Sequence, residues 1–446
     1  MRMYVTYSKK IKHYNHILKA TVEAYRNAVD FFINVCLEEW EALSMIDPSF
    51  ERQAFVEKLT HGTSKRPCVK YDFDHADKKF YKFPSYLRRG AISEAIGKVS
   101  SYQRSLEKWK NNPKRKAPGL PRAGYIYPCM YRDNMYYKRS LYTAKIKVFI
   151  RNTWDWLTVE LRKSDADYIR RYCASYKECA PTLQKRGKKW YLDFAYEKTA
   201  SLSEIDTLEQ TIVAVGFGRN NTCTCAVMQS DGTILGRKFL KLLKEQDSLM
   251  HSMNRIKKAQ QHGARKMPRL WGKVNGICRD MAVKTARFII ETAVQYHADV
   301  IVLEHLKQKN TKKDSEYEKL CLWKKKKAQE IVIGKAHRNG MHIRRVCGWN
   351  ASRLAYDGSG KARCMRYFAD GIKKYHDSVC VFPNGKIYHC DLNASYNIGA
   401  RYFIREILKS LSVKERLDIE AEVPQCSRRS TCTWSDLITL QAALAA

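Results

Sequence analysis

Two acidic residues occupy positions from which they could hold a metal ion. Glu304 directly follows the apolar run 300–303, and Asp391 opens the last predicted helix. Carboxylates placed in this way can bind Mg²⁺, which prefers hard oxygen ligands and supports hydrolysis of phosphodiesters. A third carboxylate is expected at the end of the strand-like run 211–215, but the sequence has Gly216 there. The predicted site therefore lacks one of its three ligands.

The elements that must position these residues follow a regular order in the second half of the chain. Three strands come first, and a turn of hairpin type joins the last two. A long helical stretch, a further strand and a final helix follow. We predict strands at 211–215, 222–229, 234–239 and 300–303, and helices within 240–297 and at 391–411. This is the order of an RNase H-like α/β domain, in which three acids hold two Mg²⁺ ions about 3.5–4 Å apart.

Each acid also has an ordinary structural interpretation. A Glu after an apolar strand is often the first solvated residue of a loop, and an Asp at a helix start is often an N-cap. No other acid is placed to replace the missing one. Glu209 precedes the first strand, Asp231 lies in the hairpin turn, and Asp299 lies at the opposite end of its strand. We therefore expect weak metal affinity and little or no cleavage.

The first half of the chain mixes helices and strands. Apolar residues recur at intervals of three and four in 13–43 and 91–109, which predicts two amphipathic helices. The segment 49–79 is polar and irregular, and 110–122 has the prolines and basic residues of a linker. Alternating segments between 123 and 198 predict strands. The fold class is therefore α+β with several domains, beginning with a small β-barrel that a helical insert interrupts.

Composition restricts the partners. The chain has 446 residues, with 82 Lys and Arg against 45 Asp and Glu, a formal net charge of +37. Such an excess repels itself unless a polyanion neutralises it, which favours nucleic acid. No apolar run reaches about 18 residues and the N-terminus does not resemble a signal peptide, so we expect no membrane partner. The 15 scattered cysteines indicate reduced thiols in a cytoplasmic protein.

Basic and aromatic residues gather at three places that could contact nucleic acid. These are the start of the second predicted helix, the basic loop 262–269 with the Trp after it, and the segment 324–345. In the last, the runs 324–327 and 344–345 flank a predicted helix. The candidates are Tyr86, Arg88, Arg89, Arg265, Lys266, Arg269, Trp271, Lys325, Lys326, Arg344 and Arg345. Solvated faces for the charges and a buried Trp271 are the alternatives.

The motifs around the acids resemble those of a known family. Residues 391–398 are similar to the third RuvC motif, Asp-x-Asn-Ala-Ala-x-Asn-Ile, of the TnpB-like RNA-guided nucleases and the compact type V CRISPR effectors. Residues 302–306 resemble the second motif. Residues 213–218 resemble the first, hydrophobic-Asp-hydrophobic-Gly, with Gly216 at the Asp position and Gly218 at the glycine. The resemblance covers most of the chain and implies a bacterial protein that associates with the nucleoid.

The resemblance implies a division into domains. A wedge-like β-barrel would comprise 1–12 and 123–205, with a helical recognition insert at 13–122. A RuvC/RNase H-like domain would comprise 206–446. Within it, 347–390 would be a lid or nucleic-acid-binding insertion, a degenerate form of the family's zinc ribbon.

The zinc ribbon of that family carries two Cys-x-x-Cys pairs, and this chain has none. Four isolated cysteines lie in the corresponding interval: Cys347, Cys364, Cys380 and Cys390. Their spacing argues against zinc and favours buried thiols. The Gly-rich stretch 350–361 resembles a flexible lid. Arg363, which follows it, is a candidate catalytic or phosphate-contacting residue, with a solvated surface Arg as the alternative.

Three functions are consistent with these features. The first is RNA-guided binding of double-stranded DNA with weak or absent cleavage, which requires a guide RNA. The second is an active RNA-guided endonuclease that uses Mg²⁺ held by Glu304 and Asp391. The third is an unguided RNA- or DNA-binding factor on a decayed nuclease fold. The sequence does not identify a further protein partner.

Overall fold

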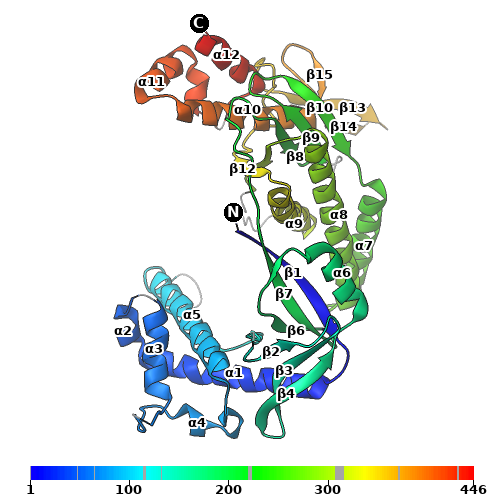
Figure 1. Ribbon diagram of the computed structural model, residues 1–446. Helices are drawn as coiled ribbons and strands as arrows, with labels where there is room; N and C mark the ends of the chain where they lie inside the picture. The colour runs from blue at the N-terminus through cyan, green and yellow to red at the C-terminus, as the bar shows by residue number, and fades with distance from the viewer. Residues whose placement is uncertain are drawn as a thin grey trace. The chain divides into compact units, whose positions relative to one another are not determined.

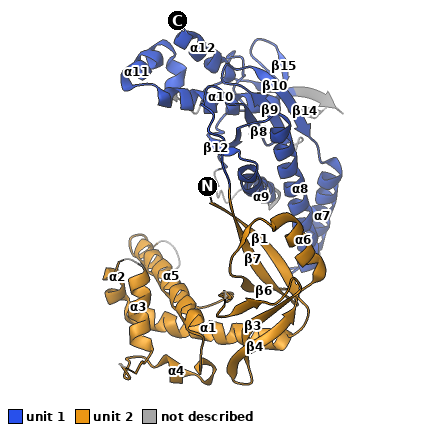
Figure 2. Ribbon diagram, viewed as in Figure 1, with its two compact units in different colours: residues 1, 200–446 blue, residues 2–199 orange. Residues whose placement is uncertain are grey.

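The computed structural model describes residues 2–47, 49–64, 66–113, 117–131, 133–218, 223–306, 316–369, 372–428 and 431–445 (Figure 1). The chain forms two compact units, residues 2–199 and residues 200–446 (Figure 2). Among the described residues, no helix combines the length and the apolar character needed to cross a membrane.

Helices make up much of the unit 2–199. Its helices are α1 (Asn15–Glu38), α2 (Trp40–Met45), α3 (Ser49–Thr60), α4 (Phe73–Ala76), η1 (Lys78–Phe80), α5 (Ser85–Lys110) and α6 (Lys163–Cys173). The two predicted amphipathic helices are confirmed as α1 with α2 and as α5. The prediction of an irregular segment at 49–79 is wrong, because α3, α4 and η1 lie there. Apolar residues in α3 follow no helical period, so the pattern did not reveal this helix.

The strands of this unit form two sheets. In one, β1 (Arg2–Ile11) pairs along its whole length with β7 (Lys189–Thr199), which also pairs with β5 (Lys177–Glu178) and β6 (Thr182–Arg186). The other contains β2 (Tyr136–Lys138), β3 (Thr143–Ile150) and β4 (Thr153–Glu160). Single bridge pairs link strand ends, such as Ile11 with Leu161. The described strands therefore form no closed barrel, in contrast to the predicted one.

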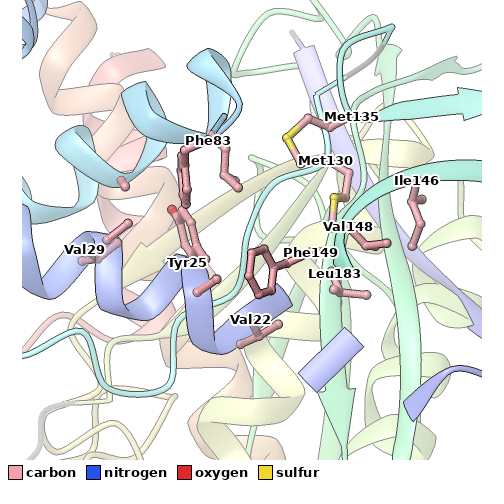
Figure 3. Packing of buried hydrophobic residues seen from close by; sticks show 14 of the residues in the cluster. Val22, Tyr25, Val29, Phe83, Met130, Met135, Ile146, Val148, Phe149 and Leu183 are labelled. Carbon is pink, nitrogen blue, oxygen red and sulfur yellow. The ribbon is translucent and has the colours of Figure 1, made fainter. Parts of the chain in front are cut away.

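One hydrophobic core joins the helices and sheets of the unit. Val22, Tyr25 and Val29 of α1 belong to this core together with Val148 and Phe149 of β3, and the Tyr25 ring points towards Phe83 (Figure 3). The spacing of three and four between the α1 residues places them on a single helix face, as the sequence pattern predicts.

The unit 200–446 is built on a five-stranded mixed sheet. Its strand order is β10 (Ile234–Leu240), β9 (Cys223–Met228), β8 (Ile212–Gly216), β11 (Val300–Glu304) and β12 (His342–Val346). β8, β11 and β12 run parallel, and β8, β9 and β10 are antiparallel neighbours. The four predicted strands are thus found within one residue of their expected ends.

Helices cover both faces of this sheet. One face packs against α8 (Pro268–Gln295) and α9 (Glu316–Arg338), and the other against α10 (Cys390–Ser410). α7 (Leu243–Gln261) packs against α8, so the predicted stretch 240–297 is two helices joined by the basic loop. The lysine run 324–327 lies inside α9 and does not flank it, which corrects that expectation.

Further elements lie beyond the sheet. The region predicted as a lid continues into a small antiparallel sheet of β13 (Arg363–Ala369), β14 (Ile372–Val381) and β15 (Ile387–His389). After α10 come α11 (Val413–Glu422), η2 (Pro424–Arg428) and α12 (Trp434–Ala445), which the sequence patterns did not reveal.

Candidate functional site

The candidate site lies where two parallel strands end. β8 ends at Gly216 and β11 at Glu304, and the pairing of Val215 with Leu303 places the two ends side by side. Side chains alternate along each strand. Ala214 and Val302 belong to the core beneath α10, so Gly216 and Glu304 face the same helix. Parallel pairing therefore brings together two positions that are 88 residues apart.

The third position lies at the start of α10. Asp391 is in its first turn, where it acts electrostatically on Glu304. His389 is the N-cap residue, and its Nδ1 accepts hydrogen bonds from the backbone N–H groups of Asp391 (3.2 Å) and Leu392 (3.3 Å). Burial lowers the pKa of His389, which keeps this nitrogen available as an acceptor. Since His389 is the cap, the Asp391 carboxylate is not needed for that role.

The two asparagines of the motif have a structural role. Asn393 accepts a hydrogen bond from the Tyr356 backbone N–H (2.8 Å) and donates to the Leu354 carbonyl (2.8 Å). Asn397 donates to the Leu354 carbonyl (2.8 Å) and accepts from the Trp434 N–H (3.1 Å). Both amides are buried, so they fix the segment before β13 and the start of α12 to α10.

Charge and burial act together on the acid pair. Burial raises the pKa of Glu304, the Lys325 ammonium opposes that shift, and the Asp391 carboxylate adds to it. Burial also raises the pKa of the Cys223 thiol, and both carboxylates contribute to that shift. A carboxyl in such a setting is more easily protonated than one in water.

The residues present do not fit a two-metal centre. Gly216 offers no ligand, and a Cβ built on it would lie 2.8 Å from Ser395 Oγ and 3.0 Å from the Asp391 carbonyl oxygen. Among the described residues, no group of three or more His, Cys, Asp or Glu side chains could hold a metal ion. Asp299, the nearest acid along β11, is engaged at the other strand end, where it accepts from the Thr211 N–H (3.0 Å). We derive no catalytic step through a metal.

Three further residues shape the site. Lys325 was predicted to bind nucleic acid, but its Nζ donates to the Phe217 carbonyl (2.9 Å), directly after Gly216. Gln329, one turn further along α9, donates to the Glu304 carbonyl (2.9 Å). A Cβ on Gly348 would lie 2.9 Å from Glu304 Oε2, so a glycine lets this turn approach the carboxylate closely. The sequence predicted Lys325 as a contact for nucleic acid, and no pattern in the lysine run indicated its hydrogen bond to the Phe217 carbonyl.

Arg363 lies in a separate cavity of about 870 Å³. This cavity is also lined by Arg353, Lys361, Phe382 and Pro383, and its described lining contains no acid. The structure thus does not place Arg363 with the carboxylates, but in a basic pocket.

The four cysteines predicted as weak zinc candidates are not brought together in the described part of the chain. Cys380 and Cys390 are neighbours, and a hydrogen bond between their thiols raises the pKa of Cys390. Cys380 Sγ also donates to the Tyr388 carbonyl (3.4 Å). Cys347 is exposed. The backbone of Cys364 pairs with that of Cys380, and its side chain lies outside the described residues.

Among the candidates at the start of α5, the two arginines differ in exposure. Arg88 is 5% exposed and forms an ion pair with Glu57 (3.2 Å), which makes it part of the structure of the helical region. Arg89 is exposed and pairs with the same acid (3.1 Å). Tyr86 is 43% exposed, and its ring lies 5.7 Å from that of Tyr131.

The remaining candidates lie on three elements of the unit 200–446. Arg265 and Lys266 are exposed in the loop between α7 and α8, Arg269 is exposed in the first turn of α8, and Trp271 packs partly against the α7–α8 core. Lys326 is half-buried on α9. Arg344 and Arg345 are exposed on β12, the edge strand of the sheet.

A groove that the sequence did not reveal lies within the unit 2–199. It encloses about 950 Å³ between α5 and the segment before β2. Small residues of α5 line one side, among them Gly90 and Gly97, and Tyr125 and Tyr127 line the other. The Arg26 guanidinium lies 5.7 Å from the Tyr125 ring and 5.0 Å from the Tyr127 ring. Tyr125 is 92% exposed, so its ring is available for stacking.

Comparisons with known proteins support the resemblance. Residues 5–150 match the Aq_aa04 family. The TnpB-like protein aq_aa05 of Aquifex aeolicus (strain VF5) is 27% identical over 209 residues, which cover 40% of this chain and 67% of that protein. The expected similarity to TnpB-like proteins is thus confirmed.

Solved structures of type V effectors are also similar. Cas12f1, in a complex with sgRNA and target DNA, is 12% identical with a TM-score of 0.48, over 85% of this chain and 81% of that chain. AacC2c1, in a binary complex with sgRNA, is 12% identical with a TM-score of 0.42, over 86% of this chain and 66% of that chain.

Proposed function

We propose that this chain binds double-stranded DNA under the direction of a guide RNA and cuts it weakly or not at all. The observation that supports weak or absent cleavage is the geometry at Gly216. The position lies beside Glu304 at the shared end of two parallel strands and close to the Asp391 backbone, yet it has no ligand, and a side chain there would require Ser395 to move. A pair of carboxylates without the third holds two metal ions poorly, and the hydrolysis depends on both.

The net charge and the resemblance of the motifs support the proposed RNA-guided binding of DNA. The net charge of +37 suits a protein that holds a heteroduplex and its displaced strand by their phosphates. In RNA-guided recognition, base pairing supplies the sequence choice, and the protein contacts the backbone and a short duplex motif. A guide RNA and a target DNA are therefore the partners that we propose.

The parts of the chain would share this work. The two sheets of 2–199 would form the wedge-like part and the helices α1 to α5 the recognition insert, with the tyrosine-lined groove as a nucleic-acid contact. Residues 347–390 would be a nucleic-acid-binding insertion that uses the basic cavity around Arg363. In a bacterial cell, such a protein would act in the cytoplasm on the nucleoid.

The decisive experiment begins with the RNA that co-purifies with the full-length protein. Sequencing it yields a candidate guide, from which a matched and a mismatched DNA duplex are made. We expect retention of the matched duplex only, and no cleavage product in Mg²⁺.

The two alternatives predict other outcomes. Cleavage of the matched duplex at the turnover of an ordinary endonuclease would establish an active enzyme with a rearranged site. Equal binding of matched and mismatched duplexes, or binding that survives removal of the RNA, would establish an unguided factor.

A further inference from the structure

The space next to Gly216, between the end of β8 and the first turns of α10, is called the corner below, and the side chain of Ser395 fills it. Ser395 lies one helical turn after Asp391, and its Oγ donates to the Asp391 carbonyl (2.8 Å). The same hydroxyl lies 3.4 Å from the Thr224 carbonyl of β9. A Cβ on Gly216 would meet Ser395 Oγ at 2.8 Å, which is closer than side chains normally approach. The third RuvC motif, which residues 391–398 resemble, has alanine at the position of Ser395.

A buried hydroxyl nearby lacks a partner. Thr224 pairs directly with Gly216 across β9 and β8, so their side-chain positions lie on the same face of the sheet. Its Oγ1 is buried and has no hydrogen-bond partner in the described part of the chain. Such an unpaired group is costly and rare. A carboxylate at position 216 would offer an acceptor on that face of the sheet.

A lysine supplies positive charge to the same corner. The Lys325 ammonium is held by the Phe217 carbonyl at 2.9 Å, and it is half-buried on α9. Its charge acts on Glu304 against the combined effects of burial and Asp391. The Asp391 carboxylate acts on Glu304 as a like charge, and a fixed ammonium can offset that repulsion without a metal ion.

We propose that Ser395 and Lys325 have together replaced the first carboxylate and its metal: Ser395 closes the corner, and Lys325 compensates the charge of Glu304 and Asp391. The corner is then a closed structural site, and restoring an acid at position 216 alone does not reopen it. Ser395 is a positioning residue here, since it acts on where the Asp391 backbone and the end of β8 can lie. The inference rests on the proposed function, because it explains why the chain would not cut.

The test measures metal binding to the full-length protein without DNA, with Mn²⁺ as the probe in calorimetric titrations. The variants are Gly216→Asp, Ser395→Ala and the double variant Gly216→Asp/Ser395→Ala, with Gly276→Asp as a control. Gly276 lies on α8, where an added Cβ meets nothing within 4 Å. We expect Mn²⁺ affinity in the double variant to exceed that of Gly216→Asp by about 10–100-fold, the usual effect of groups that position metal ligands.

A variant of Lys325 tests the second part of the proposal, the compensation of charge. Adding Lys325→Gln to the double variant removes a competing cation, and we expect Mn²⁺ affinity to rise by about a further tenfold. The proposal is overturned if Gly216→Asp alone binds Mn²⁺ as tightly as the double variant, or if the unaltered protein does. It is also overturned, for Lys325, if Lys325→Gln leaves the affinity unchanged or lowers it.

A folding control keeps the test decisive. If Gly216→Asp fails to fold and the double variant folds, closure by Ser395 is shown directly. If neither folds, Gly216→Ala and Gly216→Ala/Ser395→Ala are compared, and equal unfolding temperatures would contradict the closure. A protein that cleaves matched DNA overturns the proposed function, whereas these titrations, which contain no DNA, decide the present inference separately.

Discussion

Adding a single methyl group at Gly216 tests the closed corner without introducing any charge. In Gly216→Ala the new Cβ lies 2.8 Å from Ser395 Oγ and 3.0 Å from the Asp391 carbonyl oxygen. Overpacking of this kind costs about 1–3 kcal/mol. The backbone of Gly216 is not in the left-handed region, so the substitution also gains about 0.4–1 kcal/mol from the unfolded state. We expect the free energy of unfolding to fall by about 1–2 kcal/mol.

A second glycine provides the control for this prediction. Gly276→Ala lies in the interior of α8 with open space around it, so we expect a gain of about 0.5–1 kcal/mol. The two substitutions are chemically identical and differ only in their surroundings. Adding Ser395→Ala to Gly216→Ala should recover part of the loss, with a coupling energy of about 1 kcal/mol.

Urea unfolding supplies the measurement, and hydrogen exchange at the amides of β8 localises it to the unit 200–446. Unchanged m-values would show that the variants alter stability and not the surface that unfolding exposes. The reasoning is refuted if Gly216→Ala is as stable as Gly276→Ala, because the corner would then have room for a side chain. It is also refuted if Ser395→Ala has no influence on the effect of Gly216→Ala.

Three further predictions concern the gain or loss of single charges. Gly97→Glu places a negative charge in the groove of 2–199 and should weaken nucleic-acid binding by about tenfold, whereas Gly276→Glu should not, as measured by fluorescence anisotropy at fixed salt. Because burial raises the pKa of Glu304, its ionisation opposes folding at neutral pH. Glu304→Gln should therefore increase stability to urea at pH 7, and the gain should vanish as the pH falls below 4.5. Arg88→Met should cost about 1.5–3 kcal/mol, because it removes a buried hydrogen bond to Glu57, which keeps its contact with Arg89. Arg89→Met loses only an exposed contact with the same acid and should cost about 1 kcal/mol or less in the same assay.

The sequence was sufficient to predict four of the five strands of the sheet, all but β12, and to place Gly216 and Glu304 at strand ends. The runs 212–215 and 300–303 are apolar throughout, as is typical of strands covered on both faces, and their ends are therefore marked by the first polar or glycine residue. Parallel pairing then requires those ends to meet. The same reasoning placed Asp391 at a helix start, and the structure has it in the first turn of α10.

Other features depend on partners that are distant in the sequence. Arg88 looked like an exposed residue at a helix start, but Glu57 of α3 pairs with it, and α3 itself has no apolar period. The groove beside Tyr125 arises where a stripe of small residues on α5 faces a segment without regular structure. Neither the stripe nor the segment carries a recognisable signal alone.

Gly216, Ser395 and Lys325 show that a motif can mislead when its residues are considered one at a time. Gly216 alone indicates a lost ligand, which a single substitution ought to restore. Ser395 alone is a conservative change from alanine in a helix, and Lys325 alone is one of four adjacent lysines. Only the meeting of β8, α9 and α10 makes them a set, in which a hydroxyl fills the space of the lost side chain and an ammonium supplies the lost positive charge. The loss of one carboxylate thereby becomes a change that three elements maintain, and a substitution at Gly216 alone does not reverse it.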